Sequence, residues 1–284
     1  MNTIVVGIDG TEASLLALDW AAERAARGRT RIEIVMVAGS IFTDDFRIDA
    51  SILTAERRLR DRVPEVEVAS RRVPGRMPEA LLESATAADL LVIGSHRDRP
   101  LRSALTGWMP LQIASHSSIP VVVVPDNLSP VVGPVVVGID DDDSSREAMD
   151  VAAGEADAGG FTLAVVHAWQ MPAPRIEGSV ALLASPIQVR AEHRNTLRAA
   201  VLGVSLSYPD LDIEQVLIQE NASRALLTRA EDASLLVIGS HHRGFLARAF
   251  LGSVGQEVLS QSSVPVCVVP NIPLSARLPS VTAR

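Results

Sequence analysis

The sequence contains no lysine, so all 26 of its basic residues are arginine. This absence excludes the phosphate loop G-x-x-x-x-G-K-[ST], whose lysine contacts the β- and γ-phosphates of a nucleotide. Cysteine is limited to Cys267, so the chain cannot form an internal disulfide. No C-x-x-C or H-x₃-H spacing occurs either, and we predict no metal site of that kind.

Aromatic residues are also few, and acidic residues outnumber basic ones. Aromatics make up 3% of the chain and the formal net charge is −8, which argues against a nucleic-acid surface. No apolar run approaches the roughly 18 residues of a membrane span. The chain enters a strand-like pattern at once, at 3–8, so we predict no signal peptide. We therefore expect a cytoplasmic protein whose partners include neither nucleic acid nor a membrane.

The chain contains an internal duplication, in which its second half repeats its first. Three segments recur in the same order, with copies starting at residues 5 and 136 (VVGID), 90 and 235 (LLVIGSH), and 117 and 262 (SSIPVVVVPD and SSVPVCVVPN). The first pair is 131 positions apart and the other two are 145 apart. The difference predicts an insertion of 14 residues in the second half, between Trp169 and about residue 211.

Each half alternates apolar strands with amphipathic helices. Strand-like runs fall near 3–8, 31–37, 65–72, 89–94 and 120–124, and again near 134–139, 161–168, 212–218, 234–239 and 264–269. Continuous Val, Ile and Leu is typical of parallel strands buried on both faces, and strand–helix alternation implies right-handed crossovers. We predict an α/β fold with two tandem Rossmann-like domains, each a mainly parallel five-stranded sheet flanked by helices. The predicted boundaries are 1–127 and 132–272, with a tail at 273–284.

The turn after the fourth strand of the second half, LLVIGSHHRGFLARAFLGS, has the composition of a phosphate site. Ile238 and Gly239 end the strand, and Gly252 opens a helix whose first N–H groups and dipole favour an anion. Ser253 and Gln256 fit a capping box with Ser253 as N-cap. Positive charge is available from His241, His242, Arg243 and Arg248. A plain loop followed by a helix cap remains the alternative.

This turn resembles that of the universal stress protein family, which carries G-x-x-G, nine residues and then G-[ST] at this place. Gly239 matches the first glycine, and nine residues separate position 242 from Gly252 and Ser253. The resemblance covers both halves, through VGID, VVHAW at 165–169, FLGSVG at 250–255 and SSVPVCVVP. It implies five parallel strands per domain, a dimer-like pairing of domains and, as in many members, ATP binding.

The resemblance also implies a set of ligand contacts. Adenine and ribose contacts come from the turn after strand one and the end of strand two, and phosphate contacts come from the glycine motif. In the second domain the corresponding residues are Ile139, Asp140, Ala168, Ile238, Gly239, His242, Gly252, Ser253 and Val254. The weaker first-domain counterparts are Asp9, Val37, Gly94 and Gly107. The implied cofactor is ATP, with or without Mg²⁺.

The second domain departs from the family pattern at two places. His242 replaces the second glycine, where a β-carbon hinders phosphate approach although an imidazole can also donate to a phosphate. The turn after strand one is acidic, at Asp140–Asp143, and repels a triphosphate unless a cation intervenes. We weigh capture of Mg²⁺ against a merely acidic helix start, with Ser144 as cap and Glu147 in the first turn.

The first domain departs further. Arg97 stands at the second glycine position, and Trp108 follows Gly107 in place of a small hydroxyl residue. Pro110 has no N–H to offer an anion. We hypothesise that this domain has lost triphosphate binding and serves mainly as a structural or interaction partner. The alternative is that the cluster His96, Arg97, Arg99 and Arg102 holds an anion by charge, against our expectation of a solvated loop.

Single residues outside these turns are predicted to be structural. His167 lies in an apolar strand, and we predict that it is a hydrogen-bonded core histidine. We also predict that Cys267 packs in the core. His116 and His193 lie in helical patterns without ligand-like partners. We find no positioned general base, and therefore expect at most weak ATPase activity.

Two classes of function remain open. The first is a stress-response sensor or regulator that binds ATP chiefly in its second domain and acts on an unknown regulatory protein. The second is a nucleotide-free adaptor or scaffold that works through protein–protein contacts. The last strands, at 120–124 and 265–269, are expected to be sheet edges. They can pair within one chain as a pseudo-dimer, or between chains as a homodimer.

Overall fold

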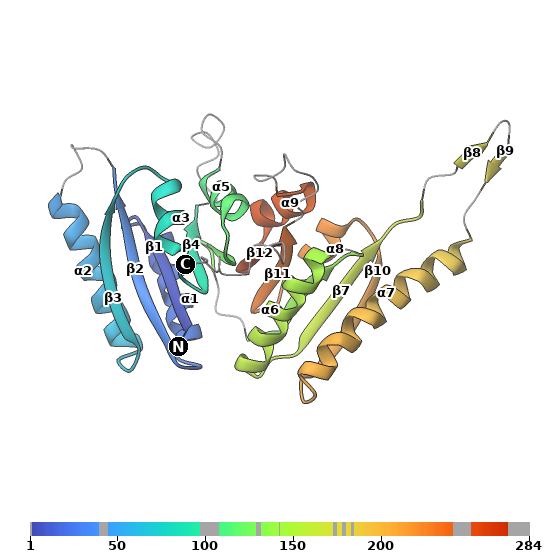
Figure 1. The fold of residues 1–284 in the computed structure, drawn as a ribbon, viewed down its shortest axis with the longest axis horizontal. Coiled ribbons are helices and arrows are strands. Elements are labelled where there is room, and N and C mark those ends of the chain that lie inside the picture. Colours follow the sequence, from blue (N-terminus) through green and yellow to red (C-terminus); the bar gives the residue numbers. More distant parts are fainter. Residues whose placement is uncertain are drawn as a thin grey trace, which may run out of the picture.

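The computed structural model describes residues 2–39, 45–96, 108–128, 132–141, 143–172, 175–177, 180–182, 185–240 and 251–271. Both halves alternate strands and helices, as predicted (Figure 1). The first half contains β1 (Asn2–Ile8), α1 (Glu12–Ala25), β2 (Thr30–Ala38), α2 (Asp45–Arg62), β3 (Glu67–Pro74), α3 (Glu79–Ala85), β4 (Leu90–Ser95), α5 (Met109–His116) and β5 (Val121–Pro125).

The second half repeats this order, with one addition. It contains β6 (Val135–Ile139), α6 (Asp143–Gly159), β7 (Leu163–Trp169), β8 (Arg175–Glu177), β9 (Val180–Leu182), α7 (Pro186–Ser207), β10 (Ile213–Gln219), α8 (Ala222–Arg229), β11 (Leu235–Ser240), α9 (Ser253–Gln261) and β12 (Val266–Pro270). None of the described helices is long and apolar enough to cross a membrane.

The sheet has ten strands, in the order β10-β7-β6-β11-β12-β5-β4-β1-β2-β3. The five strands of each half are parallel to one another, which confirms the predicted pair of Rossmann-like domains. Strand order reverses between β1 and β4, and likewise between β6 and β11. In such sheets ligands bind at the carboxyl ends of the strands beside this reversal.

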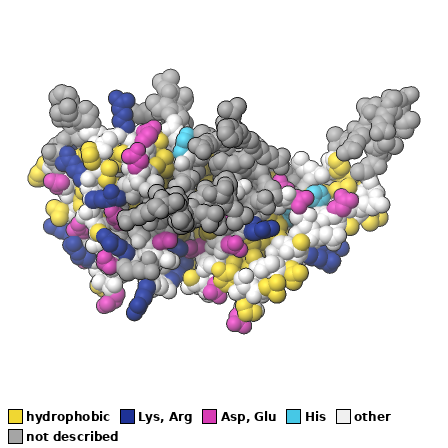
Figure 2. Space-filling view, viewed as in Figure 1, with side chains coloured by type: hydrophobic (Ala, Val, Ile, Leu, Met, Phe, Trp, Pro, Cys, Tyr) yellow, Lys and Arg dark blue, Asp and Glu magenta, His cyan; other side chains and the backbone are white. Residues whose placement is uncertain are grey.

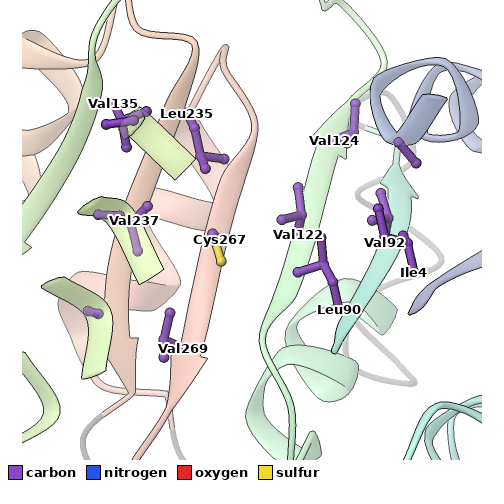
Figure 3. Packing of buried hydrophobic residues seen from close by; sticks show 14 of the residues in the cluster. Ile4, Leu90, Val92, Val122, Val124, Val135, Leu235, Val237, Cys267 and Val269 are labelled. Atoms are coloured by element: carbon purple, nitrogen blue, oxygen red, sulfur yellow. The ribbon is translucent and has the colours of Figure 1, made fainter. Parts of the chain in front are cut away.

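The two halves join at their last strands. β5 and β12 pair antiparallel, with Cys267 opposite Val122 and Val268 opposite Val121. The pairing therefore lies within one chain, which is the pseudo-dimer alternative. Buried side chains from both halves form one cluster on each face of the sheet, and Figure 3 shows members of one cluster on β5 and β12. Because these clusters cross the junction, the halves share their hydrophobic core.

A second junction lies between α1 and α6. The Arg24 Nε donates to both carboxylate oxygens of Glu155, at 2.8 and 2.9 Å, and the two side chains are 20% and 12% exposed. The guanidinium of Arg27 lies over the Phe161 ring, 5.0 Å from its centroid. The first residue of each pair is in the first half and the second residue is in the second half. This ion pair and cation–π contact thus hold the two halves together beside the β5–β12 junction.

The insertion lies where the repeat offsets predict it. The short strands β8 and β9 pair antiparallel, and Figure 1 shows this hairpin extending away from the sheet. The helix that follows begins later than the predicted 180–204, because Ser185 is its N-cap and Pro186 its first residue. Proline is favoured at a first helical position, where its missing N–H costs no hydrogen bond.

The described surface mixes both signs of charge. On the face shown in Figure 2, acidic and basic side chains are interspersed rather than gathered by sign. Several form ion pairs, including Arg58 with Asp19 at 2.7 Å and Arg60 with Glu56 at 2.8 Å.

Removing the α1–α6 ion pair is expected to destabilise the whole chain. Arg24→Ala leaves the largely buried Glu155 carboxylate without its bidentate partner, and we expect it to lower the free energy of unfolding by about 1–3 kcal/mol. Arg60→Ala is the matched control, because Arg60 is 63% exposed in its ion pair with Glu56. It is expected to cost less than about 0.5 kcal/mol. Urea unfolding of both variants measures the difference, and equal losses would contradict the assignment.

Candidate functional site

Each domain has a cavity at the carboxyl ends of its central strands. The first-domain cavity has a volume of about 460 Å³ and the second-domain cavity about 390 Å³, both within the usual size range of small-molecule sites. Both lie beside the strand-order reversal of their own half. The duplication has therefore produced two candidate ligand sites at equivalent places.

The second-domain cavity gathers the residues that the resemblance implies. All those within the described part of the chain line it: Ile139, Asp140, Ala168, Ile238, Gly239, Gly252, Ser253 and Val254. His242 lies outside the described residues, as do its neighbours His241, Arg243 and Arg248. The structure thus brings together residues from β6, β7, β11 and α9, and their role as ligand contacts remains a prediction.

The N-terminus of α9 forms one wall of this cavity. The helix begins at Ser253, and Gly252 is the N-cap, so the expected capping box with Ser253 as N-cap is wrong. The Gln256 side chain instead donates to the carbonyl of Leu251 at 2.9 Å. The first intrahelical bond joins Gln256 N to Gly252 O at 3.0 Å. The N–H groups of Ser253, Val254 and Gly255 precede it, and no side chain caps them within the described chain.

The acidic turn after β6 also contributes to the lining of this cavity, through Asp140 and Ser145. Ser145 Oγ accepts a hydrogen bond from Asp140 N at 2.7 Å, and Asp140 Oδ1 accepts one from Asp141 N at 2.9 Å. These bonds fix the backbone of the turn at the cavity. Since α6 already begins at Asp143, Ser144 lies within the first turn and is not the N-cap. No cluster of three or more metal-ligating side chains occurs among the described residues.

A histidine pair lies behind this turn. The buried His167 donates from Nδ1 to the carbonyl of Ile139 at 3.0 Å, so its Nε2 accepts from His193 Nδ1 at 2.9 Å. The His193 ring also stacks on Trp169, with centroids 5.2 Å apart. This confirms His167 as a hydrogen-bonded core residue and gives His193 a partner that the sequence pattern did not reveal. The pair fixes α7 to the ends of β6 and β7, next to the cavity.

The first-domain cavity is lined by the counterparts of these residues. Asp9, Val37 and Gly94 face it, while Gly107 and Arg97 lie outside the described residues. Ser14 Oγ lies 3.4 Å from Asp9 N, matching the bond between Ser145 and Asp140. A Cβ on Gly94 would lie 2.3 Å from the carbonyl oxygen of Ala13. Glycine is therefore required there by the packing of α1 on β4.

Several lining residues had no motif to mark them. In the second domain these are Ala222 and Leu226. Apolar residues near strand ends and helix starts look like ordinary core in a sequence, so only the tertiary structure assigns them. Ser145 is different, because it recurs 131 positions after Ser14 at the same distance from a strand-ending aspartate. That recurrence is a signal that could have identified it.

The strand order and the paired cavities define a tandem Rossmann-like α/β protein with one candidate ligand site per domain. The sequence model of the universal stress protein family matches residues 1–125 and 132–270. The chain therefore belongs to the universal stress protein family.

One relative and two solved structures are similar to this chain. Universal stress protein Rv2623 of Mycobacterium tuberculosis is 30% identical over 292 residues, covering 93% of this chain and 95% of the relative. A functionally unknown protein from Pseudomonas aeruginosa PAO1 has the same fold, with a TM-score of 0.69 at 18% identity, over 95% of this chain and 92% of that one. A shorter universal stress protein, solved in complex with cAMP, covers 43% of this chain and has 96% of its own length covered, at 26% identity and a TM-score of 0.38.

The histidine pair predicts a dependence of stability on pH. Burial lowers the pKa of His193, and the nearby His167 lowers it further, against the opposing charges of Asp140, Glu192 and Asp141. Because the folded pKa lies below the unfolded value, the unfolded chain binds more protons in this range. The contribution of His193 is therefore complete above the ordinary pKa of histidine and is lost as the pH falls through the folded pKa.

His193→Asn tests this dependence, because the amide N–H can still donate to His167 Nε2 without titrating. Between about pH 7.5 and pH 5, the parent chain is expected to lose more stability than the variant does. Urea midpoints at the two pH values provide the measurement. An identical pH dependence in both proteins would remove His193 as its source.

Proposed function

We propose that the chain binds ATP, chiefly in its second domain, and acts as a nucleotide-dependent sensor or regulator of a stress response. The observation that carries this proposal is the end of the second cavity, where three N–H groups of α9 precede its first intrahelical bond. An anion placed there accepts hydrogen bonds from the helix and lies at the positive end of its dipole. We further propose a cytoplasmic location and a regulatory protein as partner.

The rest of the second cavity suits an adenine ring. Val166, Ala168, Leu226 and Ile238 provide apolar walls, and Ala168 contributes only a small side chain. Apolar walls with a few placed polar groups are typical of small-molecule sites. The proposed arrangement puts the base against β7 and the phosphates at α9.

Asp140 is the proposed contact on the acidic side. Its carboxylate accepts from Asp141 N through one oxygen, and its other oxygen can accept from a ribose hydroxyl. Mg²⁺ bound with the triphosphate would offset the repulsion from the carboxylates, since hard cations prefer oxygen ligands. The proposed ligand is therefore ATP, with Mg²⁺ as an optional companion.

We propose binding rather than turnover as the main activity. His167, the buried histidine beside the turn, uses both ring nitrogens in hydrogen bonds. It therefore has no lone pair available to take a proton from water. Any ATP hydrolysis is accordingly expected to be weak.

A nucleotide-free adaptor is the second candidate function. It is favoured by large apolar side chains on α7, where Ile187 is 82% and Leu206 79% exposed. Exposed apolar side chains on one helix are a common basis for protein–protein contacts. One simple measurement distinguishes the two candidates. Purified protein is denatured and the supernatant is assayed for adenine nucleotide, which the sensor is expected to release and the adaptor is not.

Filling the open end of the second cavity is expected to abolish ATP binding. A Cβ on Gly252 would meet no atom of the described residues within 4 Å, so we expect Gly252→Trp to fold while its indole occupies the anion position. Hydrogen bonds to a charged group are worth about 1.5–3 kcal/mol each, so we expect ATP to bind at least about a hundredfold more weakly. Isothermal titration calorimetry measures the loss.

Gly28→Trp is the matched control, because Gly28 also has open space around it and lines neither cavity. It is expected to bind ATP as the parent does, at one nucleotide per chain. Unchanged affinity in Gly252→Trp would refute the site. A parent chain that carries no nucleotide and binds none at millimolar ATP would favour the adaptor.

A further inference from the structure

The first-domain cavity is similar in size to the second-domain cavity but is lined by different side chains. It is slightly larger than the second-domain cavity, at about 460 against 390 Å³. Its lining includes three methionines and an indole: Met36, Met77, Met109 and Trp108. Thioether and aromatic groups form a polarisable apolar surface, on which planar rings pack well.

The helix N-terminus at this cavity is less suited to an anion than that of α9. Trp108 is the N-cap of α5, and Pro110 occupies its first turn. The first intrahelical bond joins Gln112 N to Trp108 O at 3.1 Å, so only Met109 and Leu111 retain N–H groups ahead of it. Trp108, the counterpart of Ser253 at the repeat offset of 145, also lines this cavity with a bulky indole. A phosphate at α5 would therefore have one N–H donor fewer than at α9, and less space because of the indole.

The polar side of the cavity ends in a carboxylate. Thr11 donates to Asp9 Oδ1 from its backbone N at 3.0 Å and from its hydroxyl at 2.5 Å. The Thr11 hydroxyl in turn accepts from His96 Nε2 at 3.1 Å. Asp9 Oδ2 has no hydrogen-bond partner within the described part of the chain. A free carboxylate oxygen can accept a hydrogen bond from a ligand donor.

We propose that the first-domain cavity binds an uncharged planar ring compound that carries hydrogen-bond donors, and that it excludes the phosphorylated form of that compound. The ring packs against Trp108 and the methionine thioethers. Its hydroxyl or amino groups donate to Asp9. This assignment does not depend on what the second domain binds.

Trp108 provides its own reporter. The chain has three tryptophans, and Trp20→Phe with Trp169→Phe leaves Trp108 as the only one. Adenosine is the probe, with AMP and ATP as ligands that share its ring but add phosphates. Adenosine is expected to quench Trp108 fluorescence saturably at micromolar to millimolar concentration, and ATP is expected to leave it unchanged. No quenching by adenosine, or equal quenching by ATP, would overturn the proposal.

Two variants test the walls separately. By calorimetry, Trp108→Ala is expected to weaken adenosine binding at this site by about tenfold or more, and Trp108→Phe to preserve it, because an aromatic ring remains. In the single-tryptophan chain, Asp9→Asn keeps an acceptor for Thr11 but removes the charge, and is expected to weaken adenosine binding several-fold. Adenosine affinity unchanged in both Trp108→Ala and Asp9→Asn would overturn the proposal.

ATP binding by the second domain is measured in the same single-tryptophan chain by calorimetry. Adenosine quenching without calorimetric ATP binding sinks the proposal for the second domain and supports this one. ATP binding without adenosine quenching does the reverse. The two proposals therefore fail independently.

Discussion

The antiparallel pairing of β5 with β12 is the contact on which the rest of the structure depends. It joins two five-stranded parallel sheets into one sheet and lets a single hydrophobic cluster run across each face. A strand edge left unpaired would expose backbone N–H and C=O groups and a row of valines. Pairing the two edges within one chain satisfies both, and the contacts of Arg24 with Glu155 and Arg27 with Phe161 reinforce the join.

This shared sheet has a consequence for the cavities. Both cavities are built on strand ends of the same ten-stranded sheet, and each is bounded by the first turn of a helix. The sheet fixes where the walls stand, whereas the helix start decides what they can hold. Trp108 in the first copy, where the repeat places Ser253 in the second, alters the chemistry of the site without altering the architecture.

The duplicated domains have thus kept their packing and diverged at the surface of the cavities. Residues that hold backbone in place recur in both, as with Ser14 beside Asp9 and Ser145 beside Asp140. Residues that meet the cavity differ between a helix end with three N–H groups ahead of its first intrahelical bond and an indole with thioethers. Divergence of this kind has little effect on the stability of the fold, because loop and cap residues make few core contacts. It is also how one fold serves different ligands.

The sequence by itself determined the duplication, the two parallel sheets, the insertion after Trp169 and eight of the residues that line the second cavity: Ile139, Asp140, Ala168, Ile238, Gly239, Gly252, Ser253 and Val254. Each is written in local order: apolar runs, repeat offsets and glycines at strand ends. Only the tertiary structure decided the β5–β12 pairing within the chain, the true N-cap at Gly252, and the bond of His193 to His167. These depend on atoms far apart in the chain or on the exact residue at which a helix begins, and neither distance nor backbone angle is encoded by a pattern of residue types.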